Sequence, residues 1–212
     1  MAEVYLRRLS RWQAEQQRNA VADVYVGAYR GAGEGAAGAV PPDRQGFLHR
    51  LEQHVQHTGF DMVVADAAEP VGCAYGFRAP SDAEGRPDFR GALPADVEEH
   101  TASGRTFLLA ELMVLPGHRR RRIATRLVER LLVRLETELV MATTNGVPTD
   151  GAAAETFRAW GWTRYGIPAT EPCPGSGAGS GSGPGPGPGA GPGPGAGPDA
   201  ASRAVWVRRP LR

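Results

Sequence analysis

A near-continuous apolar run from Phe107 to Val114 is the strongest hydrophobic pattern in the chain. A run of this kind, without alternation, is typical of a strand buried on both faces of a sheet. Glu111 is the one polar residue within it, and Pro116 cannot donate to a sheet ladder. We therefore expect a buried strand that ends near Leu115 and carries a single acidic side chain.

The hydrophobic period changes after the turn that follows this strand. Apolar residues recur every four positions from Ile123 to Leu135, and arginines fall between them. This spacing predicts an amphipathic helix with one buried stripe. The turn thus lies at a helix N-terminus, where free N–H groups and the helix dipole favour an anion.

The same turn carries His118 and the consecutive arginines from Arg119 to Arg122. Cations at a helix N-terminus oppose the dipole, so a sequence that places them there indicates a bound anion such as a pyrophosphate. A run of arginines alone is more often a solvated surface turn. Its position between a buried strand and a helix start favours the phosphate interpretation.

The remaining patterns predict short elements on both sides of this segment. Expected strands cover residues 4–7, 62–65, 71–77, 139–144, 162–165 and 204–208, the second and third paired as a hairpin joined by residues 66–70. Expected helices cover residues 12–30, 44–57, 95–101 and 152–160, the last capped by Asp150 and stopped by Gly161. Residues 31–42 and most of 78–105 are expected to form loops.

Residues 174–199 alternate Gly-Pro and Gly-Ser and cannot form a packed core. They separate the last two expected strands. We expect a disordered insertion there, and the alternative is a tether or a lid over a substrate site.

Composition excludes several classes of chemistry. All 24 basic residues are arginine, which excludes a P-loop lysine and a Schiff-base lysine. The formal net charge of +1 gives no bulk attraction to nucleic acid or membranes. Cys73 and Cys173 show no metal or disulfide spacing, and no leader or membrane span is evident, so a cytoplasmic protein is expected. Richness in Arg, Ala, Gly and Pro is typical of a GC-rich bacterial source.

The segment from Val114 to Ala124, VLPGHRRRRIA, resembles motif A of the GNAT superfamily of acetyltransferases, in an actinobacterial type of sequence. Arg119 matches the first basic position of that motif, Ile123 its apolar position and Ala124 its final small residue. Arg122 departs from the usual glycine. If that position needs a positive φ, an arginine costs on the order of 1–2 kcal/mol, while the backbone N–H is retained.

The resemblance implies an α/β (α+β) GNAT fold, with a central mixed, mostly antiparallel twisted sheet of about seven strands flanked by about four helices. The order of the expected elements agrees with that fold over roughly residues 3–173 and 202–212. The chain would then be a single N-acetyltransferase domain, residues 1–212, with residues 174–199 inserted between the last two strands.

Superfamily members bind acetyl-CoA as cosubstrate, and the resemblance carries its contacts over to particular positions. The pantetheine arm would lie along the backbone of Leu112, Met113 and Val114. The pyrophosphate would lie in the turn, on Arg119, Arg120, Arg121, Arg122, Ile123, Ala124 and Thr125. No metal is expected.

Acyl transfer to an amine needs a base, and Glu111 is the expected one. By strand alternation it shares a face with Met113 and opposes Leu112 and Val114. An acidic side chain in a buried strand is costly unless it is paired or faces a cleft, and such a position raises its pKa. The alternative is a structural carboxylate paired with an arginine.

The tyrosine that often protonates the departing thiolate in this family aligns with Phe157, and the usual asparagine with Asp150. Phe157 cannot donate a proton, so another group or water would act. Three tyrosines are weaker substitutes: Tyr25, Tyr29 and Tyr165. Three histidines could border the acceptor site, although surface positions are the simpler interpretation: His49, His54 and His57.

These features predict an acetyl-CoA-dependent N-acetyltransferase acting on a primary amine of a small molecule or a protein. The alternative is a non-catalytic acyl-CoA-binding or regulatory domain of the same fold, which Arg122 and Phe157 keep open. The arginine cluster lacks interleaved aromatics, so neither nucleic acid nor a membrane is an expected partner. Acidic residues between 78 and 105 mildly favour a cationic acceptor, and a homodimer is left open because homodimers are common in the family.

Overall fold

The computed structural model describes residues 3–30, 43–80, 93–144, 152–167 and 203–209. Seven strands form one sheet in the order β1-β2-β3-β4-β5-β7-β6. They are β1 (Tyr5–Leu9), β2 (Asp61–Ala67), β3 (Glu69–Arg78), β4 (Thr106–Val114), β5 (Leu139–Thr144), β6 (Thr163–Ile167) and β7 (Arg203–Arg208). The helices are α1 (Arg11–Gln16), α2 (Arg18–Tyr29), α3 (Arg44–Gln56), α4 (Ala95–Ala102), α5 (Ile123–Leu132) and α6 (Ala152–Ala159), with a 3₁₀ turn η2 (Pro116–His118).

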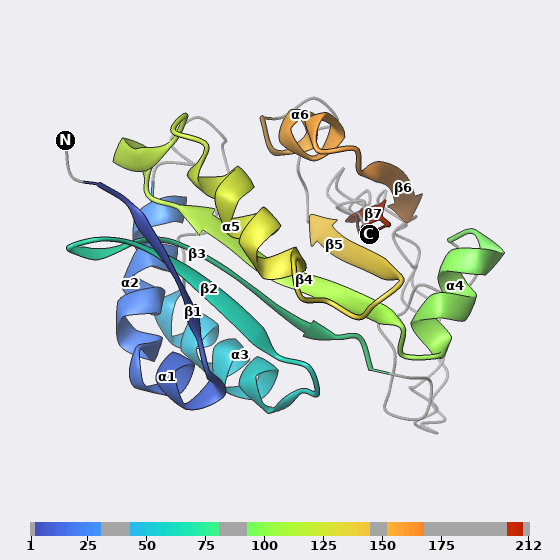
Figure 1. Cartoon of the computed structure of the whole chain (residues 1–212), viewed down its shortest axis with the longest axis horizontal. Helices are drawn as coiled ribbons and strands as arrows, with labels where there is room; N and C mark the ends of the chain where they lie inside the picture. The colour runs from blue at the N-terminus through green and yellow to red at the C-terminus, as the bar shows by residue number, and fades with distance from the viewer. Residues whose placement is uncertain (1–2, 31–42, 81–92, 145–151, 168–202, 210–212) are drawn as a thin grey trace, which may run out of the picture.

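Helices cover both faces of the sheet (Figure 1). On one face α1, α2 and α3 pack over β2, β3 and β4, with a core that includes Phe47, Leu51 and Tyr75. On the other face α5 crosses β1 to β4, and the core there joins Leu127 of α5 to Phe157 of α6. β4 and β5 are parallel and every other neighbouring pair is antiparallel. The expected fold class, a mixed and mostly antiparallel seven-stranded sheet, is confirmed.

The described helices outnumber the four or so that were expected, since there are six α-helices. The expected helix over residues 12–30 is divided at Gln17 (φ −95°, ψ 6°) into α1 and α2. Ser10 and Gln13 form a reciprocal capping box at the start of α1, which stabilises this short helix as a separate element. α4 is the short helix that was expected at residues 95–101.

Other differences concern the ends of elements. Only Ala68, with φ 75°, separates β2 from β3, so these strands extend into the expected turn at residues 66–70. α5 ends at Leu132 instead of continuing to Leu135. Asp150, Cys173 and the tract 174–199 lie outside the described residues. No helix among the described residues is long and apolar enough to cross a membrane.

A β-bulge in β4 changes which side chains face which helices. Tyr75 of β3 pairs with Glu111, whereas the next residue, Gly76, pairs with Leu109, so Ala110 is the extra residue. Before the bulge, Phe107 and Leu109 face α5. After it, Leu112 and Val114 face α5, while Ala110 and Met113 pack on the α2–α3 side.

The bulge also marks the place where β4 leaves β5. The parallel pairing runs from Thr106 with Leu139 to Leu109 with Ala142 and stops there. Beyond this point Thr143 and Thr144 of β5 pair with β7. Within the described part of the chain, residues 110–114 of β4 therefore have no strand on their β5 side, and their backbone groups on that edge are available.

Candidate active site

The arginine turn (residues 115–122) joins the free edge of β4 to the N-terminus of α5. It opens with η2 and then takes two left-handed residues, Arg120 (φ 61°) and Arg122 (φ 58°, ψ 15°). The expected positive φ at Arg122 is present, at a conformational cost of about 1–2 kcal/mol. A second such arginine was not anticipated from the sequence.

The left-handed Arg122 is the N-cap residue of α5. The first intrahelical bond runs from the N–H of Arg126 to the carbonyl of Arg122 (3.0 Å). The N–H groups of Ile123, Ala124 and Thr125 therefore have no acceptor within the helix. Arg122 adds no side-chain cap of its own. These N–H groups, together with the helix dipole, form a site suited to an anion.

Arg119 differs from its neighbours because its guanidinium bonds within the protein. Its Nε donates to the carbonyl of Val114 (3.2 Å) and its Nη2 to the carbonyl of Ala28 (2.6 Å). Its backbone N–H donates to the carbonyl of Pro116 (3.2 Å). Arg119 thus ties the end of α2 to the end of β4.

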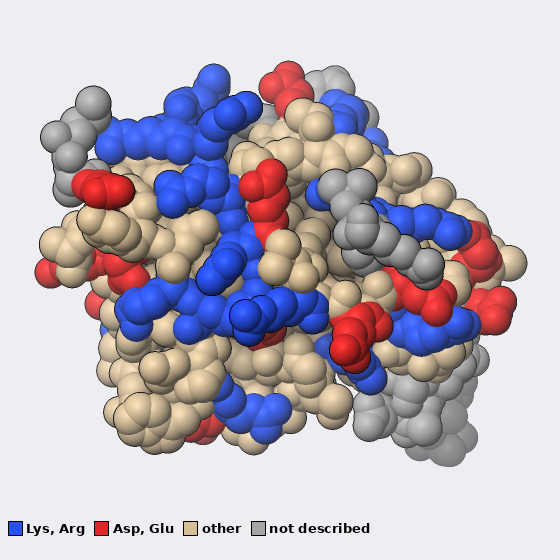
Figure 2. Space-filling view, in the orientation of Figure 1, with Lys and Arg blue, Asp and Glu red and all other residues tan. Residues whose placement is uncertain are grey.

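Arg120, Arg121 and Arg122 are exposed. Figure 2 shows arginine side chains crowded over the face formed by α5 and β1. Thr125, another expected cofactor residue, is half-buried, and its Oγ1 accepts a hydrogen bond from Trp160 Nε1 (3.2 Å). The site therefore combines free N–H groups, exposed cations and one hydroxyl bonded by Trp160, directly after α6.

Glu111 lies on the α2–α3 side of β4, as its alternation with Leu112 and Val114 predicts. Its side chain is 15% exposed. The Tyr29 hydroxyl donates to Glu111 Oε2 (3.4 Å), and Arg50 Nη2 lies 4.0 Å from Oε1. Burial raises the pKa of Glu111 to about 7, against the smaller lowering effects of Arg50 and of the Tyr29 hydrogen bond. A carboxyl with such a pKa can exchange a proton near neutral pH.

The tyrosine that bonds this carboxylate belongs to a cluster of aromatic rings. Tyr25 stacks on Phe47 (centroids 4.4 Å apart) and lies 4.9 Å from the Tyr29 ring. Burial, followed by the charge of Glu111, raises the pKa of Tyr29 and that of Tyr75. Both phenols therefore stay protonated, and Tyr29 can donate to Glu111 when this carboxyl is ionised.

The three candidate histidines have different surroundings. His54 is half-buried, and its Nδ1 lies 3.3 Å from the Tyr75 hydroxyl. Burial, helped by His57 and Arg50, lowers the pKa of His54 to about 4, so it is neutral at physiological pH. His57 stacks on Phe77 (4.4 Å), and His49 contacts Gln53. Of the three histidines, only His54 contacts the hydroxyl of Tyr75, the residue that pairs with Glu111 in the sheet.

Phe157, at the position of the family's usual tyrosine, is a core residue. It is buried and stacks on Trp206 (5.3 Å, 18° between planes), with Trp162 at its edge. Tyr165 lies apart from Glu111, packed with the α4 core on β6. Cys73 is fully buried, and burial raises the pKa of its thiol.

Arg50 and Tyr29 are the members of this site that sequence reasoning missed or undervalued. Arg50 was not considered, and Tyr29 was given only as a weak substitute for the missing tyrosine. A signal existed, because Arg50 follows Phe47 by three residues and precedes His54 by four, on the inward stripe of α3. A charged residue on an inward stripe is a candidate for a site.

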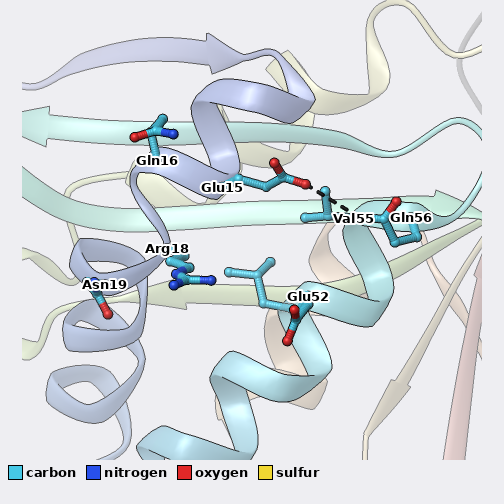
Figure 3. Close-up of a pocket in the computed structure, with 8 residues that line it drawn as sticks. Glu15, Gln16, Arg18, Asn19, Glu52, Val55 and Gln56 are labelled. Atoms are coloured by element: carbon cyan, nitrogen blue, oxygen red, sulfur yellow. Dashed lines mark hydrogen bonds between the residues drawn. The ribbon is translucent and has the colours of Figure 1, made fainter.

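A separate hollow of the described surface lies elsewhere. It has a volume of about 500 Å³ and lies between the start of α2 and the end of α3. Figure 3 shows its polar rim, in which Glu15 accepts a hydrogen bond from Gln56. Asn19 of this rim and Tyr29 are ten residues apart on α2, which is about 15 Å along a helix. This hollow is therefore separate from Glu111.

The comparisons with known proteins agree with this geometry. Residues 20–161 match the Acetyltransferase (GNAT) family. Since the match covers more than half of the chain, the chain belongs to the GNAT family of acetyltransferases. No curated protein sequence matches it significantly.

Several solved structures share the fold across the whole chain. A GNAT-family protein from Desulfovibrio desulfuricans has a TM-score of 0.60 at 13% identity and covers 99% of this chain and 100% of that chain. An acetyltransferase from Thermus thermophilus has a TM-score of 0.57 at 12% identity, covering 97% and 96%. The yncA protein of Salmonella typhimurium, solved with its cofactor acetyl-CoA, has a TM-score of 0.55 at 13% identity, covering 99% and 95%. At these identities the likeness concerns the fold.

Proposed function

We propose that the protein is an acetyl-CoA-dependent N-acetyltransferase that acts on a primary amine, with Glu111 as general base. The observation that carries the proposal is the free edge of β4, which runs from the bulge beside Glu111 to the N–H groups at the start of α5. One strand thus connects a proton acceptor to an anion site. Membership of the chain in the GNAT family supplies the class of reaction.

The residues present fit acetyl-CoA. The N–H groups of Ile123, Ala124 and Thr125 would hold the pyrophosphate, with the exposed Arg120, Arg121 and Arg122 as counter-charges. The backbone of residues 112–114 would take the amides of the pantetheine arm, since Leu112 and Val114 turn their side chains into the α5 core and Met113 into the other. Arg119 would keep the turn in place through Val114 and Ala28.

Acetyl-CoA would supply the thioester whose C–S bond breaks as the amine nitrogen forms its bond to the acetyl carbon. Glu111 would accept the proton that the amine loses, which its pKa of about 7 permits near neutral pH. Tyr29 would orient the carboxylate through its hydroxyl. Phe157 has no proton to give, so the departing thiolate would take one from water.

Thermal unfolding with acetyl-CoA, beside ATP and NAD as controls, is the first test. A ligand at 100 times its Kd adds about 2.7 kcal/mol, which is roughly 5–10 °C in Tm for a chain of this size. We expect a shift specific to acetyl-CoA, and release of free thiol when an amine is added. A shift without thiol release from any amine would favour the alternative, a non-catalytic acyl-CoA-binding domain, for which Phe157 is the supporting observation. No shift at millimolar acetyl-CoA would overturn both.

A further inference from the structure

Arg50 occupies an unusual place for a surface arginine. It projects from α3 with its guanidinium carbon 5.7 Å from the centre of the Tyr25 ring and 6.0 Å from that of Phe47. Its Nη2 is 3.5 Å from the Tyr25 hydroxyl. The side chain is 43% exposed, so the aromatic rings support it while solvent still reaches the head group.

The guanidinium has no carboxylate within hydrogen-bond distance among the described residues. Its nearest one is Glu111, at 4.0 Å, which is too long for a hydrogen bond. Arg44, on the same helix, is different, because its Nε bonds Asp23 at 2.9 Å. When Glu111 is protonated, Arg50 keeps its charge and faces no negative group among the described residues. Several of its N–H donors are therefore available to a ligand.

Arg50 and Glu111 together form a pair of opposite charges that are not hydrogen-bonded to each other. An amine beside Glu111 and a carboxylate beside Arg50 would lie about as far apart as the two protein groups, whose nearest atoms are 4.0 Å apart. In an α-amino acid the two groups are separated by a single carbon, a span on the order of 2.5–3.5 Å. A free amino acid thus matches this spacing.

We propose that the acceptor is a free α-amino acid, with its carboxylate bound by Arg50 and its amine placed against Glu111. This rests on the proposed function. The amine first loses a proton to Glu111, and its lone pair then attacks the acetyl carbon. The N–C bond forms, the C–S bond breaks and its electron pair leaves on sulfur, and the second proton that the nitrogen loses passes through water to the sulfur. The products are the N-acetylamino acid and CoA.

The mild expectation of a cationic acceptor does not conflict with this assignment. Two of the acidic residues of α4 that carried part of it have arginine partners, since Asp96 bonds Arg209 (3.2 Å) and Glu99 lies 3.6 Å from Arg105. An amino acid also presents a cationic amine. A free amino acid differs from a peptide N-terminus in its free carboxylate, which Arg50 would bind.

The test compares amino acids with their primary amides, which keep the amine and lack the carboxylate. We expect the wild type to prefer the free acids in kcat/KM. On the high-pH plateau, where the effect of Arg50 on the pKa of Glu111 no longer matters, the substitution Arg50→Gln should lower kcat/KM for the acids by about 10–100-fold, the usual effect of losing a hydrogen bond to a charged group, and change it by less than about 3-fold for the amides. Arg50→Lys should recover part of the loss. Arg44→Gln is the matched control, because Arg44 is already paired, and it should leave the preference unchanged.

Other outcomes would overturn the assignment. Equal use of acids and amides by the wild type would show that no carboxylate is recognised. If Arg50→Gln lowered kcat/KM equally for acids and amides, Arg50 would act only by lowering the pKa of Glu111. The pH profile of kcat/KM would then shift by the same amount with both acceptors. Failure of the proposed function looks different, because the wild type would release no thiol with any amine. If Arg50→Gln does not fold, the preference of the wild type for acids over amides and the same preference in Arg50→Lys still test the assignment.

Discussion

The Tyr29 hydroxyl donates a hydrogen bond to Oε2 of Glu111 across 3.4 Å, from the last residue of α2 to the bulge of β4. The neighbouring residue of α2 is also tied down, since Arg119 bonds the carbonyl of Ala28. The C-terminal end of α2 is thus held both by the candidate base and by the arginine turn. A substitution at Glu111 should therefore alter the arginine turn, and a substitution in the turn should alter the surroundings of Glu111.

Removing the Tyr29 hydroxyl should make Glu111 harder to ionise. The hydrogen bond from Tyr29 lowers the pKa of Glu111, which burial otherwise raises to about 7. The base acts as a carboxylate, so kcat/KM of the wild type should rise with pH and level off above about 7. In Tyr29→Phe we expect this rise to move to higher pH, with the plateau retained. The measurement is thiol release as a function of pH, with Tyr165→Phe, remote from Glu111, as control. An unmoved profile would mean that Glu111 is not the group that titrates.

Glu111 should also lower the stability of the folded protein above neutral pH. Its folded pKa of about 7 exceeds the ordinary 4.5, so folding binds a proton between these values and stability falls as pH rises through that window. The full penalty, about 3 kcal/mol, is present above pH 7 and absent below about 4.5. Glu111→Gln should therefore unfold roughly 5–10 °C higher than the wild type at pH 8, and at about the same temperature near pH 4.5.

His54 provides an internal check on this stability profile. Its folded pKa of about 4 lies below the ordinary 6.5, so its contribution is lost as pH falls from 6.5 towards 4. In the wild type the effects of Glu111 and His54 on the pH dependence of stability have opposite signs. Thermal scans of Glu111→Gln should therefore show stability that rises with pH between about 4 and 6.5. A wild-type-like profile in that variant would contradict the assignment.

Much of the path from β4 to α5 could be predicted from the sequence, because local patterns determine it. An unbroken apolar run and a four-residue period define the strand and the helix, and Glu111 is the one acidic residue within the run. The side of Glu111 was also predicted correctly. What could not be predicted depends on contacts between distant segments. The inward bonds of Arg119 and the closeness of Arg50 to Glu111 arise only once α2 and α3 pack on the sheet.

The bulge illustrates the same limit. Alternation counted from Phe107 would have placed Glu111 on the α5 side, and only counting from Val114 gives the right side. The extra residue at Ala110 resolves the disagreement between the two counts. Nothing in the apolar run itself marks Ala110, and the shift shows only in the pairing with Tyr75 and Gly76 of the partner strand.

The left-handed Arg122 offers a way to separate the fold of the arginine turn from its charge. Glycine adopts φ 58° without strain, so Arg122→Gly should stabilise the protein by about 1 kcal/mol, or roughly 2–4 °C in Tm. Arg121→Gly, at a neighbouring position whose φ is not positive, should destabilise it instead. If the backbone N–H groups bind the pyrophosphate, as proposed, Arg122→Gly should retain most of its thermal shift with acetyl-CoA. Loss of that shift would assign the binding to the guanidinium.

Gly76 is expected to be indispensable for the bulge that frees the edge of β4. A Cβ added there would overlap the carbonyl oxygen of Leu108 and lie 2.5 Å from the ring of Phe107, which are held by the sheet and by the core. Gly76→Ala should therefore force β3 and β4 apart, at a cost of about 1–3 kcal/mol or more. Because the bulge positions Glu111, thiol release should fall further than the loss of stability alone explains.

Gly117→Ala is the matched control for this prediction. Nothing lies within 4 Å of the added atom, and Gly117 does not have a positive φ, so the free energy of unfolding should stay within about 0.5 kcal/mol of the wild type. Thermal unfolding and thiol release, measured on both variants at a temperature where both are folded, distinguish the two effects. If Gly76→Ala proves as stable and as active as Gly117→Ala, the β3–β4 register around Tyr75 and Glu111 would need a different explanation.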